Sequence, residues 1–84
     1  MKIQAEISIY PLRTESLSEP VEEFCRILSD HGLEIKTASM STVVRGELKD
    51  LFKASAVAFE QLAEKYEVVL NMKLSNACPL DRSN

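Results

Sequence analysis

The segment IQAEISIY, residues 3–10, alternates strictly between two kinds of side chain. Its odd positions are all apolar. Its even positions all carry polar groups, namely Gln4, Glu6, Ser8 and Tyr10. Because successive side chains of a strand point to opposite faces, this period of two predicts a strand with one buried face. Pro11 is expected to end the strand, since proline offers no backbone N–H to a neighbour.

Two stretches with a period near 3.6 predict two helices. Ser18 is the expected N-cap of the first helix, and Gly32 its left-handed C′ residue. The apolar stripe between them includes Cys25, which we expect to be a small core residue. The second helix is expected from Leu48 onward, with apolar positions at 48, 51, 52, 59, 62, 63 and 66.

Three further strands complete the pattern. Glu34–Ser39 and Thr42–Glu47 are separated by two residues, which predicts an antiparallel hairpin. Alternation over residues 68–75 predicts the last strand. Right-handed crossovers are expected to place the first and third strands side by side and parallel, flanked by the fourth and the second. The predicted fold class is α+β: a ferredoxin-like βαββαβ sandwich with a four-stranded antiparallel sheet, order 4-1-3-2, and two helices on one face.

Length and composition predict one small domain. The chain has 84 residues, 45% of them hydrophobic and 27% charged, so we expect residues 1–79 to fold together and 80–84 to form a polar tail. A net charge of −3 argues against a nucleic-acid partner. No apolar run approaches the ~20 residues of a membrane span, and no signal peptide is recognisable. With two cysteines and one histidine, we expect a cytoplasmic protein without a metal or other cofactor.

The sheet face that the helices leave uncovered is the informative surface. Its predicted members are Gln4, Glu6, Ser8 and Tyr10 on the first strand, Val43 and Arg45 on the third, and Val69, Asn71 and Lys73 on the fourth. A face that mixes hydrogen-bonding and apolar groups usually packs on a second copy of the chain or holds a ligand. The sequence therefore favours binding over catalysis.

Three short motifs on this framework resemble those of one family. Ile7–Leu12 (ISIYPL) is similar to the S-x-Y-P-L strand end of the YkoF-type thiamine/hydroxymethylpyrimidine-binding domain. Met40–Glu47 (MSTVVRGE) resembles its S-T-x-V-R-G segment, and also the M-G-T-x-x-E-G-E segment of the related MTH1187-type, thiamine-binding UPF0045 family. Val68–Ser75, followed by Cys78-Pro79, resembles the family's last strand and C-P ending.

The resemblance implies a ferredoxin-like protein that binds thiamine, or its hydroxymethylpyrimidine precursor, and is not an enzyme. YkoF-type chains carry two such domains in tandem. This single domain therefore implies a homodimer in place of the tandem pair, with a homotetramer as a further option. Arg45 follows the YkoF pattern, whereas the single-domain relatives tend to have Glu at that position.

A thiamine site needs hydrogen-bonding groups for the aminopyrimidine, a wall against its face, and a counter-charge for the thiazolium. The candidate polar groups are Glu6, Ser8, Thr37, Thr42 and Asn71, and the candidate walls are Tyr10, Met40 and Val69. Glu6 is the best counter-charge on the central strand. Arg45 suits a phosphorylated ligand or an ion pair with Glu6 or Glu47. Each candidate also has a purely structural alternative, such as a hairpin hydroxyl for Thr42 or an interface contact for Asn71.

Two other classes of function stay open. A dimeric ferredoxin-like enzyme would need an acid–base group in a closed cavity, and Glu6 and Tyr10 are the central-strand candidates. An ACT-like regulatory or assembly module would act through edge-to-edge sheets. An RNA-recognition role would need several aromatic residues on the sheet and a basic surface, which this acidic chain does not offer.

Overall fold

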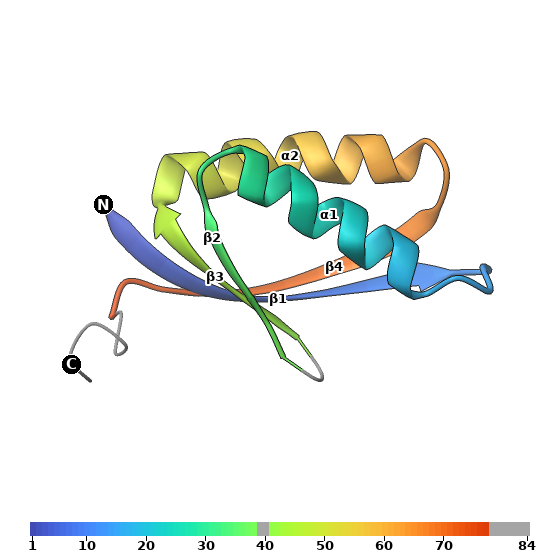
Figure 1. The fold of residues 1–84 in the computed structure, drawn as a ribbon, viewed down its shortest axis with the longest axis horizontal. Coiled ribbons are helices and arrows are strands. Elements are labelled where there is room, and N and C mark those ends of the chain that lie inside the picture. Colours follow the sequence, from blue (N-terminus) through green and yellow to red (C-terminus); the bar gives the residue numbers. More distant parts are fainter. Residues whose placement is uncertain (39–40, 78–84) are drawn as a thin grey trace.

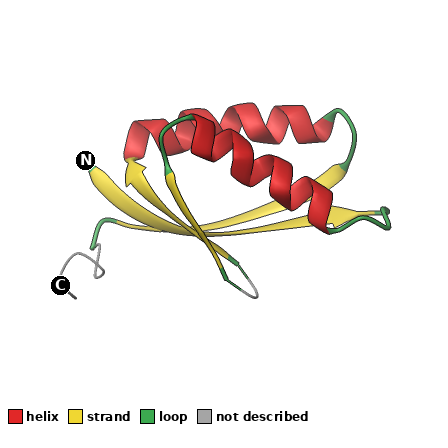
Figure 2. Ribbon diagram, in the orientation of Figure 1, coloured by secondary structure: helices red, strands yellow, loops and turns green. Residues whose placement is uncertain are grey.

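A computed structural model describes residues 1–38 and 41–77 and shows a sheet with two helices on one face (Figures 1 and 2). The elements are β1 (Lys2–Leu12), α1 (Ser18–Asp30), β2 (Glu34–Thr37), β3 (Thr42–Glu47), α2 (Leu48–Ala63) and β4 (Glu67–Ser75). This order confirms the predicted α+β, ferredoxin-like fold. No helix within the described ranges has the length and apolar character needed to cross a membrane.

The sheet has the strand order β2-β3-β1-β4, which is the predicted order read from the other edge. Every neighbouring pair is antiparallel. The expectation that the first and third strands would be parallel is wrong. The crossover through α1 makes β1 and β2 run the same way, and the hairpin then returns β3 between them in the opposite direction.

β1 is longer than the sequence predicts, and Pro11 does not end it. Pro11 lies opposite Val68 of β4, and β1 continues to Leu12. The β1–β3 ladder has already ended at the pair Ile7–Thr42, so only one neighbouring strand remains at Pro11. A missing N–H is tolerated at such a half-free edge. The β1–β4 pair therefore projects beyond the rest of the sheet (Figure 1).

The two ends of α1 differ in how closely they follow the prediction. Ser18 is the first helical residue and not the cap, because Leu17 occupies the N-cap position and makes no side-chain hydrogen bond. Gly32 has a φ of 86°. Its N–H donates to the Ser29 carbonyl at 3.0 Å, and that of Leu33 donates to Leu28 at 3.3 Å. These bonds close the helix as a Schellman motif and confirm Gly32 as the C′ residue.

The core lies between the sheet and the two helices. Its fully covered side chains include Ile3, Ile7 and Val44 from the sheet and Phe24, Leu28, Leu51 and Leu62 from the helices. On α2 the buried residues are Leu51, Ala54, Ser55, Ala58 and Leu62. Phe52 and Phe59 were expected in the apolar face of this helix, but they are 53% and 37% exposed. Each lies one residue, or about 100° of helix rotation, from a buried position.

The first residue of the chain is tied to the start of α2. The Met1 ammonium donates a hydrogen bond to Glu47 Oε1 at 2.9 Å, and the Leu48 N–H donates to the Met1 carbonyl at 3.0 Å. The hydrogen bond from the ammonium, followed by its positive charge, lowers the pKa of the Glu47 carboxyl below its usual value.

Gly46 allows the loop after α1 to pack directly on β3. A Cβ atom at Gly46 would lie 2.6 Å from Leu33 Cδ2, and Leu33 is buried. We expect Gly46→Ala to lower the free energy of unfolding by about 1–3 kcal/mol, as overpacking in a core usually does. Urea denaturation followed by circular dichroism measures this change.

Gly32→Ala is the matched control, because an added Cβ there meets nothing within 4 Å. Its cost arises from the positive φ alone, about 1 kcal/mol. If Gly46→Ala left the denaturation midpoint unchanged, the close packing of Leu33 on β3 would be contradicted.

Candidate functional site

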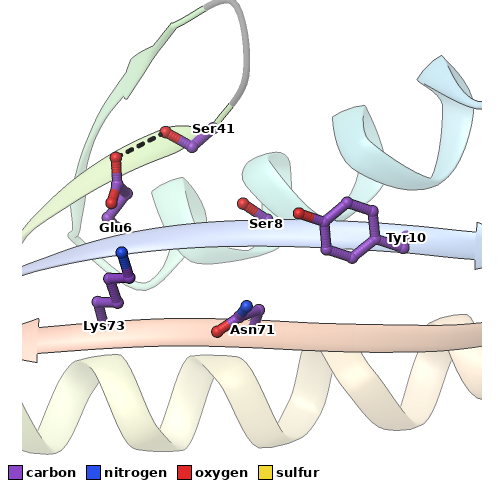
Figure 3. A pocket seen from close by; sticks show the side chains of 6 residues that line it. All are labelled: Glu6, Ser8, Tyr10, Ser41, Asn71 and Lys73. Atoms are coloured by element: carbon purple, nitrogen blue, oxygen red, sulfur yellow. Dashed lines mark hydrogen bonds between the residues drawn. The ribbon is translucent and has the colours of Figure 1, made fainter.

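The uncovered face of the sheet contains a shallow hollow of about 250 Å³. It is lined by Glu6, Ser8, Tyr10, Ser41, Asn71 and Lys73, which we call the sheet pocket (Figure 3). Three of these residues come from β1, two from β4, and one lies immediately before β3. The pocket therefore lies on the two strands that project furthest from the rest of the sheet.

The position of the pocket follows from where β3 begins. β3 starts at Thr42, opposite Ile7, so residues of β1 beyond Ile7 have β4 alone beside them. The side chains of Ser8 and Tyr10 are consequently left uncovered on the side where β3 would otherwise continue. The pocket lies at the place where β1 loses its β3 neighbour.

The register of β1 against β4 arranges the pocket in three rows. Glu6 lies opposite Lys73, Ser8 opposite Asn71, and Tyr10 opposite Val69. The first row is charged, the second is neutral and forms hydrogen bonds, and the third combines an aromatic ring with an aliphatic side chain. Directly opposed side chains on one face of a sheet lie about 5 Å apart, so the two members of each row are close neighbours; Val69, in the third row, borders the pocket residues without lining the pocket.

The charged row keeps its groups accessible. Ser41 Oγ donates a hydrogen bond to Glu6 Oε2 at 3.1 Å, the dashed line in Figure 3. Among the described residues, neither Glu6 nor Lys73 has an ion-pair partner within 4.0 Å. Both side chains are exposed. A carboxylate and an ammonium group are therefore available to a ligand at one end of the pocket.

The pocket presents charged, hydrogen-bonding and aromatic groups side by side. Ser8 and Asn71 together offer donors and acceptors, and the Tyr10 ring is 51% exposed beside Val69, which is 49% exposed. Within residues 1–38 and 41–77 there is no group of three or more His, Cys, Asp or Glu side chains suited to a metal ion.

Four of the residues proposed from the sequence meet in the sheet pocket: Glu6, Ser8, Tyr10 and Asn71. Thr42 lies on the opposite, helix-covered face, where it is buried and its Oγ1 is 3.8 Å from Cys25 Sγ. Thr37 pairs with Thr42 and shares that face. The structure does not bring either threonine into the pocket, and Met40 lies outside the described residues. Cys25, expected in the core, is half-buried.

Arg45 is on the uncovered face but does not line the pocket. It lies opposite Gln4 on β1 and Glu34 on β2. Its Nε is 3.8 Å from Glu34 Oε1, an ion pair different from those expected with Glu6 or Glu47. Arg45 therefore has an ion-pair partner on β2 and is not among the residues that line the pocket.

Two pocket residues were missed as ligand contacts. Lys73 was placed on the open face by alternation, but its position opposite Glu6 depends on the β1–β4 register. The sequence predicts Ser41 only as part of the connection between two strands. Its local sequence carries no signal for a contact with Glu6, which is 35 residues away.

The fold and the pocket together define a class of protein: small ferredoxin-like α+β domains whose uncovered sheet face carries a hollow lined by polar side chains. A family model described as "Thiamine-binding protein" matches residues 5–77. The chain belongs to this family. The resemblance stated from the sequence motifs is thereby confirmed.

Individual relatives agree with this assignment. The UPF0045 protein MJ1052 of Methanocaldococcus jannaschii is 32% identical over 71 residues, which cover 83% of this chain and 64% of the relative. The chain thus spans less than two thirds of that relative's length. The crystal structure of MJ1052 matches with a TM-score of 0.81 at 30% identity, covering 89% of this chain and 79% of the other.

Two more distant structures show the fold alone. Protein SP2199 of Streptococcus pneumoniae matches with a TM-score of 0.82 at 19% identity, covering 99% of this chain and 94% of its own. Protein TM0486 of Thermotoga maritima, whose name assigns it provisionally to thiamine biosynthesis or salvage, matches with a TM-score of 0.79 at 18% identity. The matched region covers 94% of this chain and 87% of that protein.

Proposed function

We propose that this protein binds thiamine, or the related hydroxymethylpyrimidine, in the sheet pocket without making or breaking a bond. The observation that carries the proposal is the three-row arrangement of charged, hydrogen-bonding and aromatic groups along β1 and β4. Thiamine has the same sequence of chemical groups: a cationic thiazolium, a methylene link, and a flat aminopyrimidine with donors and acceptors on its edge.

The rows follow the order of the ligand's groups. Successive residues on one face of a strand are about 7 Å apart, so neighbouring rows can contact neighbouring rings of one small molecule. Glu6 would face the thiazolium, Ser8 and Asn71 the edge of the pyrimidine, and the Tyr10 ring its face. Membership of a family described by thiamine binding supports the same assignment.

A second copy of the chain would complete the site. The pocket of one copy has about 250 Å³, below the roughly 300–1,000 Å³ of sites that enclose a small molecule. Tyr10, Leu12 and Val69 leave apolar surface exposed at the far end of the same strands, with exposures of 51%, 46% and 49%. Pairing of two open faces across a two-fold axis would cover this surface and enclose the ligand. The functional unit is then a homodimer that sequesters or delivers its ligand.

Isothermal titration calorimetry with thiamine and with hydroxymethylpyrimidine tests the proposal. We expect saturable binding of at least one ligand, and a loss of roughly tenfold in affinity in Asn71→Ala, which removes the pyrimidine-edge contact. Glu22→Gln is the control, since Glu22 is exposed on α1, on the side of the sheet away from the pocket. Absence of both heat and a thermal shift with either ligand at millimolar concentration would overturn the proposal.

A further inference from the structure

The outer side of α2 carries an exposed apolar stripe that neither the core nor the sheet pocket uses. It consists of Phe52, Ala56, Phe59 and Ala63, which we call the α2 seam. All four are exposed, and the two aromatic side chains are 53% and 37% accessible to solvent. Exposed apolar surface that is contiguous, in contrast to scattered single residues, often belongs to an interaction site.

The spacing of the α2 seam is that of a helix–helix contact. Its residues follow one another at intervals of four, three and four, so they form one line along the helix. This is the spacing of the a and d positions in a heptad repeat. The neighbouring positions Ser55 and Leu62 are buried against the rest of the protein, so the seam lies at the edge of the packed side of α2.

We propose that the α2 seam packs antiparallel against the α2 seam of a second copy around a two-fold axis. In this arrangement Phe52 of each copy lies beside Ala63 of the other, and Phe59 lies beside Ala56. Each aromatic ring therefore meets an alanine, and the large and small side chains interdigitate. The seam is complementary to itself when antiparallel, as a two-fold interface requires.

The charges beside the α2 seam are complementary in the same orientation. Lys53 and Glu60 are both exposed, and each follows a phenylalanine of the seam by one residue, so they border it on the same side. Antiparallel packing brings Lys53 of one copy beside Glu60 of the other, twice per interface. Parallel packing would instead put this border of one copy and the same border of the other on opposite sides of the seam, so Lys53 and Glu60 of one copy would meet neither residue of the other. The charge pairs therefore form only in the antiparallel arrangement.

This contact is separate from the proposed ligand site. Both helices cover one face of the sheet, and the sheet pocket opens on the other (Figure 1). One chain can therefore use both surfaces at once. If the open faces also pair, the α2 contact joins two dimers into a homotetramer. If they do not pair, the α2 contact alone gives a dimer.

Sedimentation velocity across a concentration series tests the α2 contact. We expect Phe52→Ser combined with Phe59→Ser to halve the mass of the assembly, whether the wild type is a tetramer or a dimer. Each single charge reversal, K53E or E60K, is expected to weaken this association roughly tenfold, because it places like charges together twice per interface. The double variant K53E/E60K exchanges the two charges and is expected to restore the association.

Glu22→Lys, an equivalent reversal on the exposed side of α1, is the control and should leave the mass unchanged. Circular dichroism verifies the fold of every variant, and the exposed charge variants keep the test valid if the double serine variant does not fold. A wild type that is monomeric throughout the series would overturn the proposal. So would an unchanged mass in the charge variants, or a K53E/E60K variant no better than the single ones. Thiamine titration of the same variants separates this outcome from failure of the ligand site.

Discussion

Glu6→Gln is expected to weaken thiamine binding roughly tenfold to a hundredfold and to leave hydroxymethylpyrimidine binding almost unchanged. The substitution keeps the size of the side chain and one acceptor oxygen, which can still accept the Ser41 hydroxyl, and it removes the negative charge. Charge-assisted contacts contribute about 1.5–3 kcal/mol, which corresponds to this range of affinity. The pyrimidine alcohol lacks the thiazolium, so it has no cation for Glu6 to neutralise. Calorimetric titration of both ligands measures the ratio directly.

Lys73→Gln is the control that should act in the opposite direction. Lys73 lies opposite Glu6 and has no ion-pair partner among the residues that the structure describes. Removing its positive charge is expected to raise the affinity for thiamine several-fold and to lower that for thiamine monophosphate, whose phosphate it would contact. If Glu6→Gln weakened both thiamine and hydroxymethylpyrimidine equally, the role of Glu6 as a counter-charge would be contradicted. Thermal unfolding should not change, because Glu6 is exposed.

The alternation of residues 3–10 was enough to predict half of the sheet pocket. It placed Glu6, Ser8 and Tyr10 on one face, and the same period in β4 placed Asn71 and Lys73 on the uncovered side. These assignments need local geometry alone. The same rule, applied to β3, would also have excluded Thr42: it is two residues from Val44, and both side chains point to the helices.

Features that depend on distant contacts were beyond local patterns. Pro11 continues its strand because the β1–β3 ladder stops at Ile7, so β3 does not lie beside Pro11. The position of that stop depends on the β1–β3 register. The contact of Ser41 with Glu6 has the same origin. The exposure of Phe52 depends on the rotation of α2 about its own axis. That rotation is set by packing of small residues such as Ala54 and Ala58, which are completely buried. The hydrophobic pattern of the sequence includes both position 51 and position 52, so it cannot determine the rotation of α2 about its axis.

Leu51→Ala and Phe52→Ala are adjacent substitutions for which the structure predicts very different outcomes. Leu51 is fully buried, so its truncation is expected to lower the free energy of unfolding by about 2–5 kcal/mol. Domains of 84 residues have total stabilities of about 4–13 kcal/mol, so this loss would leave the variant partly unfolded at moderate temperature. Phe52→Ala removes a larger side chain that is 53% exposed, and should cost less than about 1 kcal/mol in dilute protein. Urea denaturation of both variants gives the comparison.

Measurements at several protein concentrations further distinguish a core residue, as expected for Leu51, from an interface residue, as proposed for Phe52. If the α2 seam joins two copies, association stabilises the wild type more strongly as the protein is concentrated, because folded chains alone can pair. The deficit of Phe52→Ala should therefore grow with concentration, whereas that of Leu51→Ala, which arises within one chain, should already be present at the lowest concentration. Equal losses in both variants at every concentration would show that Phe52 is part of the core, and would contradict both the orientation of α2 and the contact proposed for its outer side.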